Sequence, residues 1–586
     1  MITFKSATVF GIDPSQMVAA ASGLFILPFF LFSATSGQIA DKFEKSRIIH
    51  IIKLAEVGIM CLAAIGFVTQ HFELLMIVLF LMGLHSTFFG PIKYGILPQH
   101  LTEEQLVGGN ALIEAGTFLA ILLGTIAGGS LITIDSHGPA IVSFALIVVA
   151  LFGFIASLRI PKAPAVDKDI VININPLKPT VEIIKFTQKN RSVFLSVLGV
   201  SWFWFFGASI LSLLPPYCRD VLRTNSSVIT LFIAVFSVGI GIGSLLCERL
   251  SHGGLELGLV PLGSIGMSLF TFDLFLIGSP DFYLDSMTIS QFLSEITGVR
   301  ILFDLLALAV FSGFFIVPLY TFIQEKSAIT HRSRVIAANN IINAFFMVTA
   351  SLLLMLLFHY KVFISQIFLI LAVLNGAVAL YIYTLLPEFL IRFLIWTIAN
   401  LMYRLRVVGI ERVPKVGPAL LVCNHVSFID WMIIGAAVKR PVRFIMDHNF
   451  AKGWVAKTLL KQAKVILIAT KKEDPEMMRL AFEKAAKELS EGEIVCIFPE
   501  GKITYDGTLN PFRPGVEILL RQTPVPVIPL ALKGMWGSFF SRKGGRAFSK
   551  RNNRFWSRIV LEVGELVPPQ NASASYLQEC VSKMLV

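Results

Sequence analysis

The sequence contains few charged residues. Only 15% of its 586 residues are Asp, Glu, Lys or Arg, while 55% are hydrophobic. Soluble domains carry about 25% charged residues, so this composition argues against a soluble protein. A net charge of +12 would suit nucleic acid, but no basic element is interleaved with stacking aromatics. We therefore expect no nucleic-acid partner and assign the excess Lys and Arg to the cytoplasmic loops of a membrane protein.

Cysteine is also scarce. The six cysteines form no Cys-x-x-Cys pair, and no histidine lies at metal-ligand spacing from them. We expect free thiols and no metal site. Residues 1–16 lack the positive start and apolar core of a signal peptide, so we expect the first apolar segment to be retained.

Long apolar segments fill the first two thirds of the chain. A helix needs about 20 mostly apolar residues to cross a membrane, and eleven such segments occur before residue 390. Five precede and six follow a basic stretch at residues 161–192. The segments lie near residues 17–40, 48–69, 73–97, 107–133, 139–159, 193–217, 227–247, 256–278, 301–323, 335–358 and 363–386.

Five plus six segments around a basic loop resemble the two six-helix halves of a major facilitator transporter without its first helix. The string GQIADKFEKSR at residues 37–47 resembles the signature after the second helix of that family, although a later family glycine is Glu44 here. The resemblance implies a first half at 1–160, a cytoplasmic linker at 161–192 and a second half at 193–387. It also leads us to expect a truncated or misassigned chain start.

The distribution of charge predicts the orientation. Loops after residues 41, 93, 159, 249 and 326 hold most of the Lys and Arg, which marks the cytoplasmic side. Ionisable residues inside apolar spans are costly and therefore candidates for transport. We select Asp41 in the signature, and Glu56 and Glu114 deeper in the spans, where they would bind a cation or orient a lipid headgroup.

The composition changes after residue 387. Residues 388–406 are apolar with arginines at their edges, which predicts a juxtamembrane amphipathic helix. From residue 407 onward, short apolar runs alternate with helical patterns, which predicts a cytoplasmic α/β domain at 407–586. The expected strands are 419–422, 465–468, 494–498 and 527–532, and the expected amphipathic helix is 477–489.

Two polar blocks follow predicted strands. In NHVSFID (424–430), Asp430 is near enough to His425 across a helical turn to accept a hydrogen bond from one imidazole nitrogen. The other nitrogen can then take a proton from a hydroxyl. Taken alone, the block would also suit a helix cap. The second block, FPEGKIT (498–504), favours catalysis.

Both blocks, with VPVIP at 525–529, resemble three motifs of the glycerophospholipid acyltransferases. The resemblance implies that His425 is the general base and that Asp430 orients it. Family members often carry a phosphate-binding Arg in another motif, but residues 464–472 have none, so Lys471, Lys472 or Arg513 would have to replace it. The expected substrate-binding residues are Asn424, Ser427, Phe498, Pro499, Glu500, Gly501, Lys502, Thr504 and Arg513.

The amino-acid sequences of these blocks are most similar to the acyltransferase module of the bacterial 2-acylglycerophosphoethanolamine acyltransferases. FFGPIKYGILP (88–98) resembles the lysophospholipid transporters that act beside them. The resemblance implies a fused importer and reacylase in the bacterial inner membrane, acting on membrane phospholipids and a lysophospholipid acceptor. We expect no bound cofactor, and because no acyl-activating domain is present, acyl carrier protein or coenzyme A would deliver the acyl group as a thioester. The alternative is a 1-acylglycerol-3-phosphate acyltransferase on an unrelated or inactive transporter-like anchor.

Overall fold

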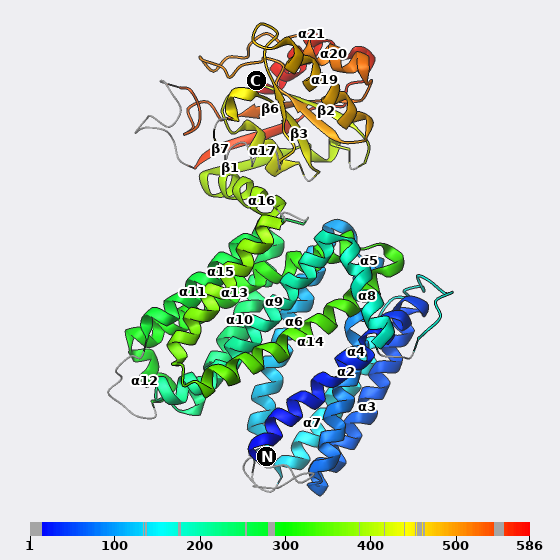
Figure 1. The fold of residues 1–586 in the computed structure, drawn as a ribbon, viewed down its shortest axis with the longest axis vertical. Coiled ribbons are helices and arrows are strands. Elements are labelled where there is room, and N and C mark those ends of the chain that lie inside the picture. The colour runs from blue at the N-terminus through cyan, green and yellow to red at the C-terminus, as the bar shows by residue number, and fades with distance from the viewer. Residues whose placement is uncertain are drawn as a thin grey trace. The chain divides into compact units, whose positions relative to one another are not determined.

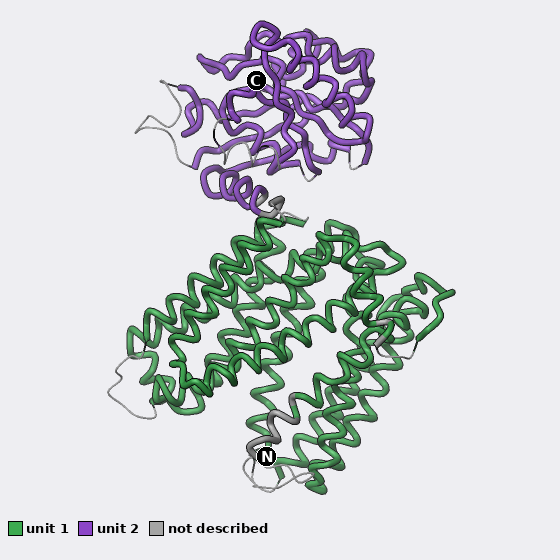
Figure 2. Tube along the Cα trace, viewed as in Figure 1, with its two compact units in different colours: residues 1–385 green, residues 386–586 purple. Residues whose placement is uncertain are grey.

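The structure is a computed structural model in which the chain forms two compact units, Met1–Leu385 and Leu386–Val586 (Figure 2). It describes residues 14–132, 134, 137–173, 177–251, 255–278, 287–385, 387–414, 416–438, 440–451, 453, 460, 463–543 and 556–586.

The first unit is a bundle of long helices (Figure 1). Within the described residues, eleven helices are long and apolar enough to cross a membrane, so the eleven predicted spans are confirmed. The long helices are α2 (Pro14–Lys42), α3 (Lys45–Thr69), α4 (Phe72–Gly95), α6 (Glu103–Ile132), α7 (Gly138–Ser157), α9 (Arg191–Pro216), α10 (Ser226–Leu250), α11 (Leu259–Ile277), α13 (Ile296–Lys326), α14 (Arg332–His359) and α15 (Ile364–Leu385). Shorter helices are α5 (Leu97–His100), α8 (Leu177–Lys189), η1 (Tyr217–Val221), α12 (Ile289–Ser294) and η2 (Ile329–His331).

Helices from the two halves of the first unit pack against each other. Helix α2 contacts α14, and α6 contacts α10 and α13. Glycines permit close approaches between the halves: a Cβ on Gly37 in α2 would lie 2.8 Å from the Cβ of Ala337 in α14. Small residues of this kind let membrane helices pack closely without a hydrophobic driving force.

The basic linker at 161–192 is tied to the bundle. Its helix α8 buries Ile183 against Ala34 of α2 and against Ala338 and Ile341 of α14. Upstream of α8, Ala163 accepts a hydrogen bond from the backbone N–H of Lys45 (2.9 Å). The linker therefore contacts both halves.

Glu44, which departs from the transporter signature, caps helix α3. Its carboxylate accepts hydrogen bonds from the backbone N–H groups of Ser46, Arg47 and Ala163 at 3.1, 3.0 and 2.8 Å. Partial burial favours a higher pKa for this carboxyl group, but these hydrogen bonds outweigh it and lower the pKa. A helix N-terminus offers free N–H donors that a carboxylate satisfies. Glu44 therefore caps α3 at the position where the transporter signature has a glycine, which has no side chain to accept these hydrogen bonds.

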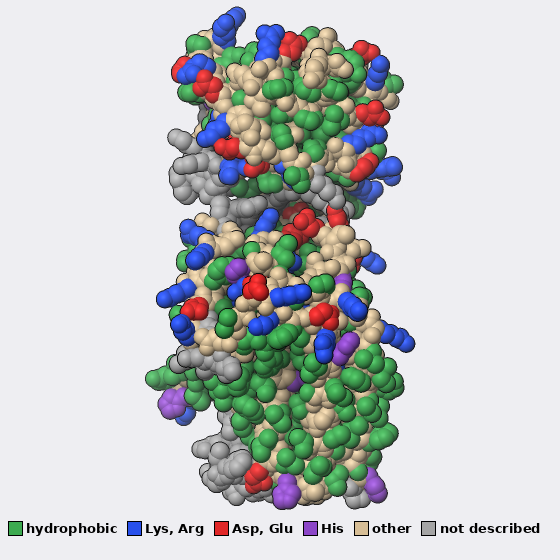
Figure 3. Space-filling model, turned by 90° about the vertical axis from the view of Figure 1, so that its right-hand side faces the viewer, with side chains coloured by type: hydrophobic (Ala, Val, Ile, Leu, Met, Phe, Trp, Pro, Cys, Tyr) green, Lys and Arg blue, Asp and Glu red, His purple; other side chains and the backbone are tan. Residues whose placement is uncertain are grey.

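The surface of the first unit is divided by charge. On the face drawn in Figure 3, hydrophobic side chains cover a broad part of the helical bundle, and Lys and Arg gather at one end of it. The α2–α3 turn and the linker contact each other, and Lys42 Nζ donates a hydrogen bond to Ile170 O of the linker (2.8 Å). A broad apolar surface with cations at one end is typical of a multi-pass membrane protein.

The second unit is an α/β domain with a seven-stranded sheet in the order β1-β7-β6-β2-β5-β3-β4. All neighbouring strands are parallel except β6 and β7. The strands are β1 (Tyr403–Val408), β2 (Ala419–Cys423), β3 (Val442–Asp447), β4 (Ile466–Ile468), β5 (Ile494–Ile497), β6 (Val527–Lys533) and β7 (Ser557–Val563).

Helices cover both faces of this sheet. In β2, Leu421 and Cys423 join a core with residues of α16 (Pro387–Thr397), η3 (Ile398–Met402) and α17 (Asp430–Ala437). Leu420 and Val422 face the opposite way, toward α19 (Pro475–Ser490), α20 (Gly515–Gln522) and α21 (Ala574–Leu585). Alternate strand residues point to opposite faces, so a fully apolar β2 indicates a strand covered on both sides. Short 3₁₀ turns are η4 (Ile410–Arg412), η5 (His448–Phe450) and η6 (Pro569–Asn571).

The prediction of one juxtamembrane helix at 388–406 is wrong in its second part. Helix α16 ends at Thr397, a π-helical turn follows, and Tyr403 begins β1, which pairs with β7. Arg404 and Arg406 are therefore strand residues rather than the edge of an amphipathic helix. Local composition could not reveal this because the partner strand lies at the far end of the domain.

Shortening a side chain in the central strand should destabilise the second unit. We expect Leu421→Ala to cost about 2–5 kcal/mol, because Leu421 is fully buried and its loss leaves a cavity. Leu480→Ala, at a half-exposed position on α19, should change stability by less than about 0.5 kcal/mol. Heat-dependent labelling of the buried thiols of Cys423 and Cys496 in the detergent-solubilised full chain measures both. Equal midpoints for the two variants would contradict this account of the core.

Candidate functional site

The two polar blocks meet at one edge of the sheet. Strands β2 and β5 are parallel neighbours, with Leu421 opposite Cys496 and Val422 opposite Ile497. NHVSFID leaves the carboxyl end of β2, and FPEGKIT leaves the carboxyl end of β5. Ligands of open α/β sheets bind outside the carboxyl ends of the strands, so this edge is the candidate active site.

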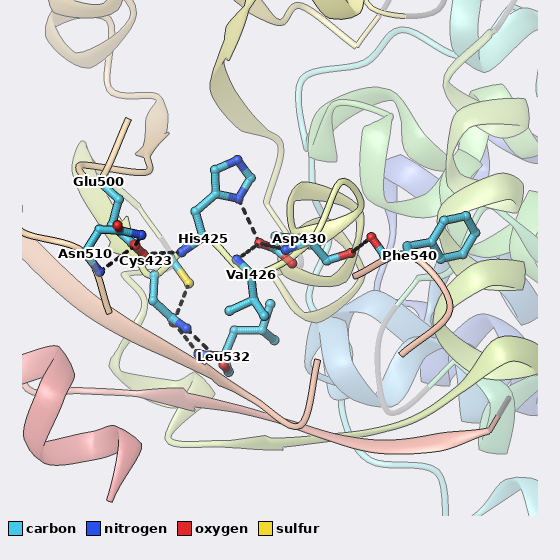
Figure 4. A network of polar contacts seen from close by, with 10 residues as sticks. Cys423, His425, Val426, Asp430, Glu500, Asn510, Leu532 and Phe540 are labelled. Atoms are coloured by element: carbon cyan, nitrogen blue, oxygen red, sulfur yellow. Dashed lines mark hydrogen bonds and ion pairs between the residues drawn. The ribbon is translucent and has the colours of Figure 1, made fainter. Parts of the chain in front are cut away.

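Asp430 holds the imidazole of His425 and the turn around it. Asp430 Oδ2 lies 2.8 Å from His425 Nδ1 and accepts hydrogen bonds from the backbone N–H groups of Val426 (2.7 Å) and Ser427 (2.9 Å) (Figure 4). The carboxylate is fully buried, whereas the His425 side chain is 19% exposed. Because an ionised Asp430 can only accept, Nδ1 carries the proton and Nε2 presents its lone pair.

Glu500 joins the second block to the first. Its Oε1 accepts from the backbone N–H of His425 (2.6 Å), and its Oε2 accepts from the backbone N–H and side-chain amide of Asn510 (2.9 and 2.7 Å). In return, His425 O accepts from the backbone N–H of Thr504 (3.0 Å). Both carboxylate oxygens of Glu500 are thus engaged in holding loops, as Figure 4 shows.

Other polar residues of the blocks also form hydrogen bonds within and between the loops. Asn424 pairs with Leu532 of β6 through two hydrogen bonds of 2.7 and 3.1 Å. The Ser427 hydroxyl donates to Phe540 O (3.0 Å). The Thr504 hydroxyl donates to Asp506 (3.0 Å). These contacts position the loops around His425.

His425 faces a cavity of about 700 Å³ within the second unit, a size typical of ligand pockets. Its walls are largely apolar and aromatic, with Phe498 stacked on the His425 ring at a centroid distance of 4.3 Å. His425 also lines a smaller pocket of about 230 Å³, together with Asn424, Glu500 and Thr504.

The structure divides the sequence-predicted site residues into two groups. His425, Phe498, Pro499, Gly501, Lys502 and Arg513 line the large cavity. Asn424, Ser427, Asp430, Glu500 and Thr504 do not line it; they hold the surrounding loops. Of the two lysines considered as phosphate ligands, Lys471 lines the cavity and Lys472 does not.

Two features of the cavity could not be predicted from the sequence. Arg542 reaches it from the loop after β6, which an antiparallel bridge between Ser427 and Ser541 brings beside the first block. Gly501 adopts a φ of +64°, and a Cβ there would lie 3.0 Å from the Arg513 guanidinium. Glycine thus permits both the turn and the close approach of Arg513.

The cysteines beside the site do not have the character of nucleophiles. Cys423 and Cys496 are fully buried, and burial raises the pKa of each thiol above its usual range. A buried, protonated thiol is inert. Neither thiol is therefore a candidate nucleophile for acyl transfer.

Among the transport candidates of the first unit, Asp41 and Glu56 form ion pairs. Asp41 is buried at the end of α2 and accepts a hydrogen bond from Arg334 Nε (3.1 Å) at the start of α14. Glu56 on α3 pairs with Lys53 (2.8 Å) and lies 3.5 Å from His85 Nε2 on α4. Asp41 thus bridges the halves, whereas the Glu56 contacts stay within the first half.

Glu114 lies at the contact between the halves. It is fully buried in α6 and accepts a hydrogen bond from the Tyr94 hydroxyl (2.5 Å). Tyr94 stacks on Tyr320 of α13 with ring centroids 4.4 Å apart. The second oxygen of Glu114 is buried and has no hydrogen-bond partner among the described residues. Such a group in a membrane bundle is a functional candidate.

The fold and these sites define a polytopic membrane protein with an attached acyltransferase domain. The family model of the Major Facilitator Superfamily matches residues 1–351, and that of the Acyltransferase family matches residues 404–533. The chain belongs to the major facilitator superfamily, and its second unit is an acyltransferase.

Several known proteins and solved structures are similar to parts of this chain. The Lysophospholipid transporter LplT of Klebsiella pneumoniae is 30% identical over 312 residues, covering 52% of this chain and 70% of that protein. LplT of Serratia proteamaculans is 28% identical, with 53% and 70% covered. The PlsC acyltransferase structure from Thermotoga maritima has 21% identity and a TM-score of 0.28, covering 36% of this chain and 80% of that one. The human organic anion transporter MFSD10 has 13% identity and a TM-score of 0.47, with 67% and 87% covered.

Replacing Glu500 by Gln should weaken catalysis through geometry. The Gln amide has one acceptor oxygen, so it can accept from the His425 loop or from the Asn510 loop but not from both. Its NH2 group would then face an N–H donor of the other loop. We therefore expect the rate of acyl transfer to fall about tenfold to a hundredfold. Glu476→Gln, which alters an exposed carboxylate on α19, should leave the rate unchanged. Rates are measured on full-length protein in membranes. A wild-type rate for Glu500→Gln would contradict the role of Glu500 as the link between the loops.

Proposed function

We propose that this protein moves lysophospholipid across the bacterial inner membrane and reacylates it on the cytoplasmic side. The observation that carries the enzymatic step is the arrangement of His425. Its Nδ1 is held by Asp430, while Nε2 has no hydrogen-bond partner among the described residues and the ring lines a large apolar cavity.

The arrangement supports direct acyl transfer. His425 Nε2 takes the proton of the acceptor's glycerol hydroxyl, and the hydroxyl oxygen attacks the carbonyl carbon of an acyl thioester. The C–O ester bond forms, the C–S bond breaks, and the imidazolium returns the proton to the leaving thiolate. Asp430 stabilises the imidazolium while it exists. The step requires no metal or bound cofactor; the donor is acyl carrier protein or coenzyme A thioester.

The cavity supports an amphiphilic substrate. Apolar side chains such as Trp431, Met432 and Ile445 provide walls for an acyl chain. Lys502 and Arg513 on the same cavity provide charge for a phosphate. A lysophospholipid carries both features, with its reactive hydroxyl between them.

The transport part of the proposal rests on the similarity of the first unit to proteins named lysophospholipid transporters. The concentration of Lys and Arg at one end of the bundle supports an orientation with that end in the cytoplasm. Glu114 would accept a cationic or hydrogen-bonding headgroup at the contact between the two halves.

A second candidate is synthesis of phosphatidic acid from 1-acylglycerol 3-phosphate, with the membrane unit serving as an anchor or moving another compound. Among the described residues, four cations line the cavity, Lys471, Lys502, Arg513 and Arg542, against one acidic residue, Asp447. This excess of positive charge suits the dianionic phosphate monoester of that acceptor.

Replacing His425 by Ala should abolish acyl transfer. We expect the rate to fall about 10²- to 10⁴-fold, the usual contribution of a general base. His448→Ala alters the other histidine of the second unit, which does not line the cavity, and should retain the wild-type rate. Assays use sealed inverted membrane vesicles with lysophosphatidylethanolamine or 1-acylglycerol 3-phosphate and both thioester donors.

The choice of acceptor separates the candidates. His425-dependent transfer to lysophosphatidylethanolamine supports reacylation, whereas a clear preference for 1-acylglycerol 3-phosphate would assign the protein to phosphatidic acid synthesis. Transfer that persists without His425 would overturn the catalytic assignment.

Replacing Glu114 by Gln should slow lysophospholipid uptake. We expect about a tenfold decrease, equivalent to one lost hydrogen bond to a charged group. Labelled lysophosphatidylethanolamine is followed into proteoliposomes containing the His425→Ala protein, so that reacylation cannot trap it. Glu103→Gln, at an exposed position on α6, is the matched control. Uptake unchanged by Glu114→Gln would remove this residue from the transport site, and no uptake by the unsubstituted membrane unit would favour an anchor.

A further inference from the structure

Arg542 occupies an unusual position on the cavity wall. Its guanidinium carbon lies 4.6 Å from the ring centroid of Tyr505 and 5.2 Å from that of Phe428. Phe428 belongs to the first block and Tyr505 directly follows the second. Both rings line the same cavity as His425. The two blocks therefore supply an aromatic clamp for a cation that comes from a third loop.

The clamp orients the guanidinium without neutralising it. An aromatic face attracts Arg electrostatically, and a guanidinium near a ring face keeps N–H groups at its edge for another partner. No carboxylate within the described residues forms an ion pair with Arg542. By contrast, Arg443 in the same unit is paired with Glu488 and Glu493.

Arg513 provides a second cation of the same kind. It approaches the backbone of Gly501 closely, lines the cavity, and also lacks an ion-pair partner among the described residues. Asp447, the acidic residue that lines this cavity in the described part of the chain, caps the turn η5 by accepting from the backbone N–H of Asn449 (2.8 Å). The cavity thus holds unpaired positive charge beside apolar walls and a catalytic imidazole. An anion with an apolar tail satisfies this combination.

We propose that Arg542 is a phosphate-binding residue of the acyltransferase site, acting with Arg513 on a phosphate ester and oriented by Tyr505 and Phe428. The proposal rests on the proposed acyl transfer and names a residue outside the three sequence motifs. The phosphate belongs either to the glycerophosphate of the acceptor or to the phosphopantetheine arm of the donor. Both present the same oxygens to an Arg fork.

Kinetics of the full-length protein in membranes test this assignment. We expect Arg542→Gln to raise the KM for one phosphate-bearing substrate about tenfold to a hundredfold, with kcat nearly unchanged, because the hydroxyl and thioester still meet at His425. Arg542→Lys keeps the positive charge but loses the paired N–H donors of the guanidinium. Its KM should therefore lie between those of the wild type and Arg542→Gln. Tyr505→Leu, which removes one ring of the clamp, should shift the same KM by a smaller factor. Lys543→Gln changes the adjacent cation, which does not line the cavity, and serves as the matched control.

The source of the phosphate follows from which KM changes. Arg542 binds the acceptor if the KM for lysophosphatidylethanolamine rises while the KM values for the thioester and for monoacylglycerol, a phosphate-free acceptor, do not change. A rise for the thioester with every acceptor assigns it to the donor. Unchanged KM values for both substrates, or a loss confined to kcat, would overturn the proposal. These results are distinct from failure of the proposed function, which would appear as wild-type protein giving no His425-dependent transfer to a lysophospholipid.

Discussion

One oxygen atom, Oδ2 of Asp430, receives the imidazole N–H of His425 and the backbone N–H groups of Val426 and Ser427. These three hydrogen bonds connect the direction of the catalytic ring to the path of the chain after β2. The carboxylate is fully buried, so water does not compete for it. Hydrogen bonds to a buried ionised acceptor are stronger than those between neutral groups, and the position of the base follows from this one group.

Other residues of the site hold the turn that carries His425 through hydrogen bonds from neighbouring strands. Glu500 holds the His425 peptide from the loop after β5, and Asn424 holds the adjacent residue against β6. Three neighbouring strands thus converge on the same short turn. This arrangement leaves the large cavity to be lined by apolar side chains and cations rather than by the polar residues of the motifs. Motif residues mainly fix geometry here, while residues between and after the motifs form much of the cavity wall.

Under the proposed function, joining the two units raises the effective concentration of lysophospholipid at the acyltransferase without a new contact. The membrane unit has few buried charges, and several of these pair with one another, as Asp41 does with Arg334 and Glu56 with Lys53. Glu114 differs because its hydrogen-bond donor among the described residues is the Tyr94 hydroxyl rather than a cation. A path with few fixed charges suits an amphiphile better than a small ion.

Local patterns predicted the elements whose signal lies within a short segment. The eleven spans follow from length and hydropathy and are confirmed, and strands β2, β4, β5 and β6 were expected from their apolar runs. Strands β1, β3 and β7 were missed because arginines and other polar residues interrupt them. In β3, Arg443 is buried yet paired with Glu488 of α19, a compensation that no local pattern reveals. The predicted boundary between the helix at 388–406 and the α/β domain was also misplaced, because β1 is defined by its pairing with β7.

By itself, the sequence determined that the chain is a membrane bundle followed by an α/β domain, because hydropathy and alternation are properties of consecutive residues. It also determined the pairing of His425 with Asp430, since five residues across a strand-to-helix turn bring an imidazole and a carboxylate into contact. Only the tertiary structure decided which polar residues face the cavity. Glu500 and Ser427 turned toward the backbone because buried N–H and C=O groups need partners, and Arg542 came to the cavity because strand order brings a distant loop beside the first motif.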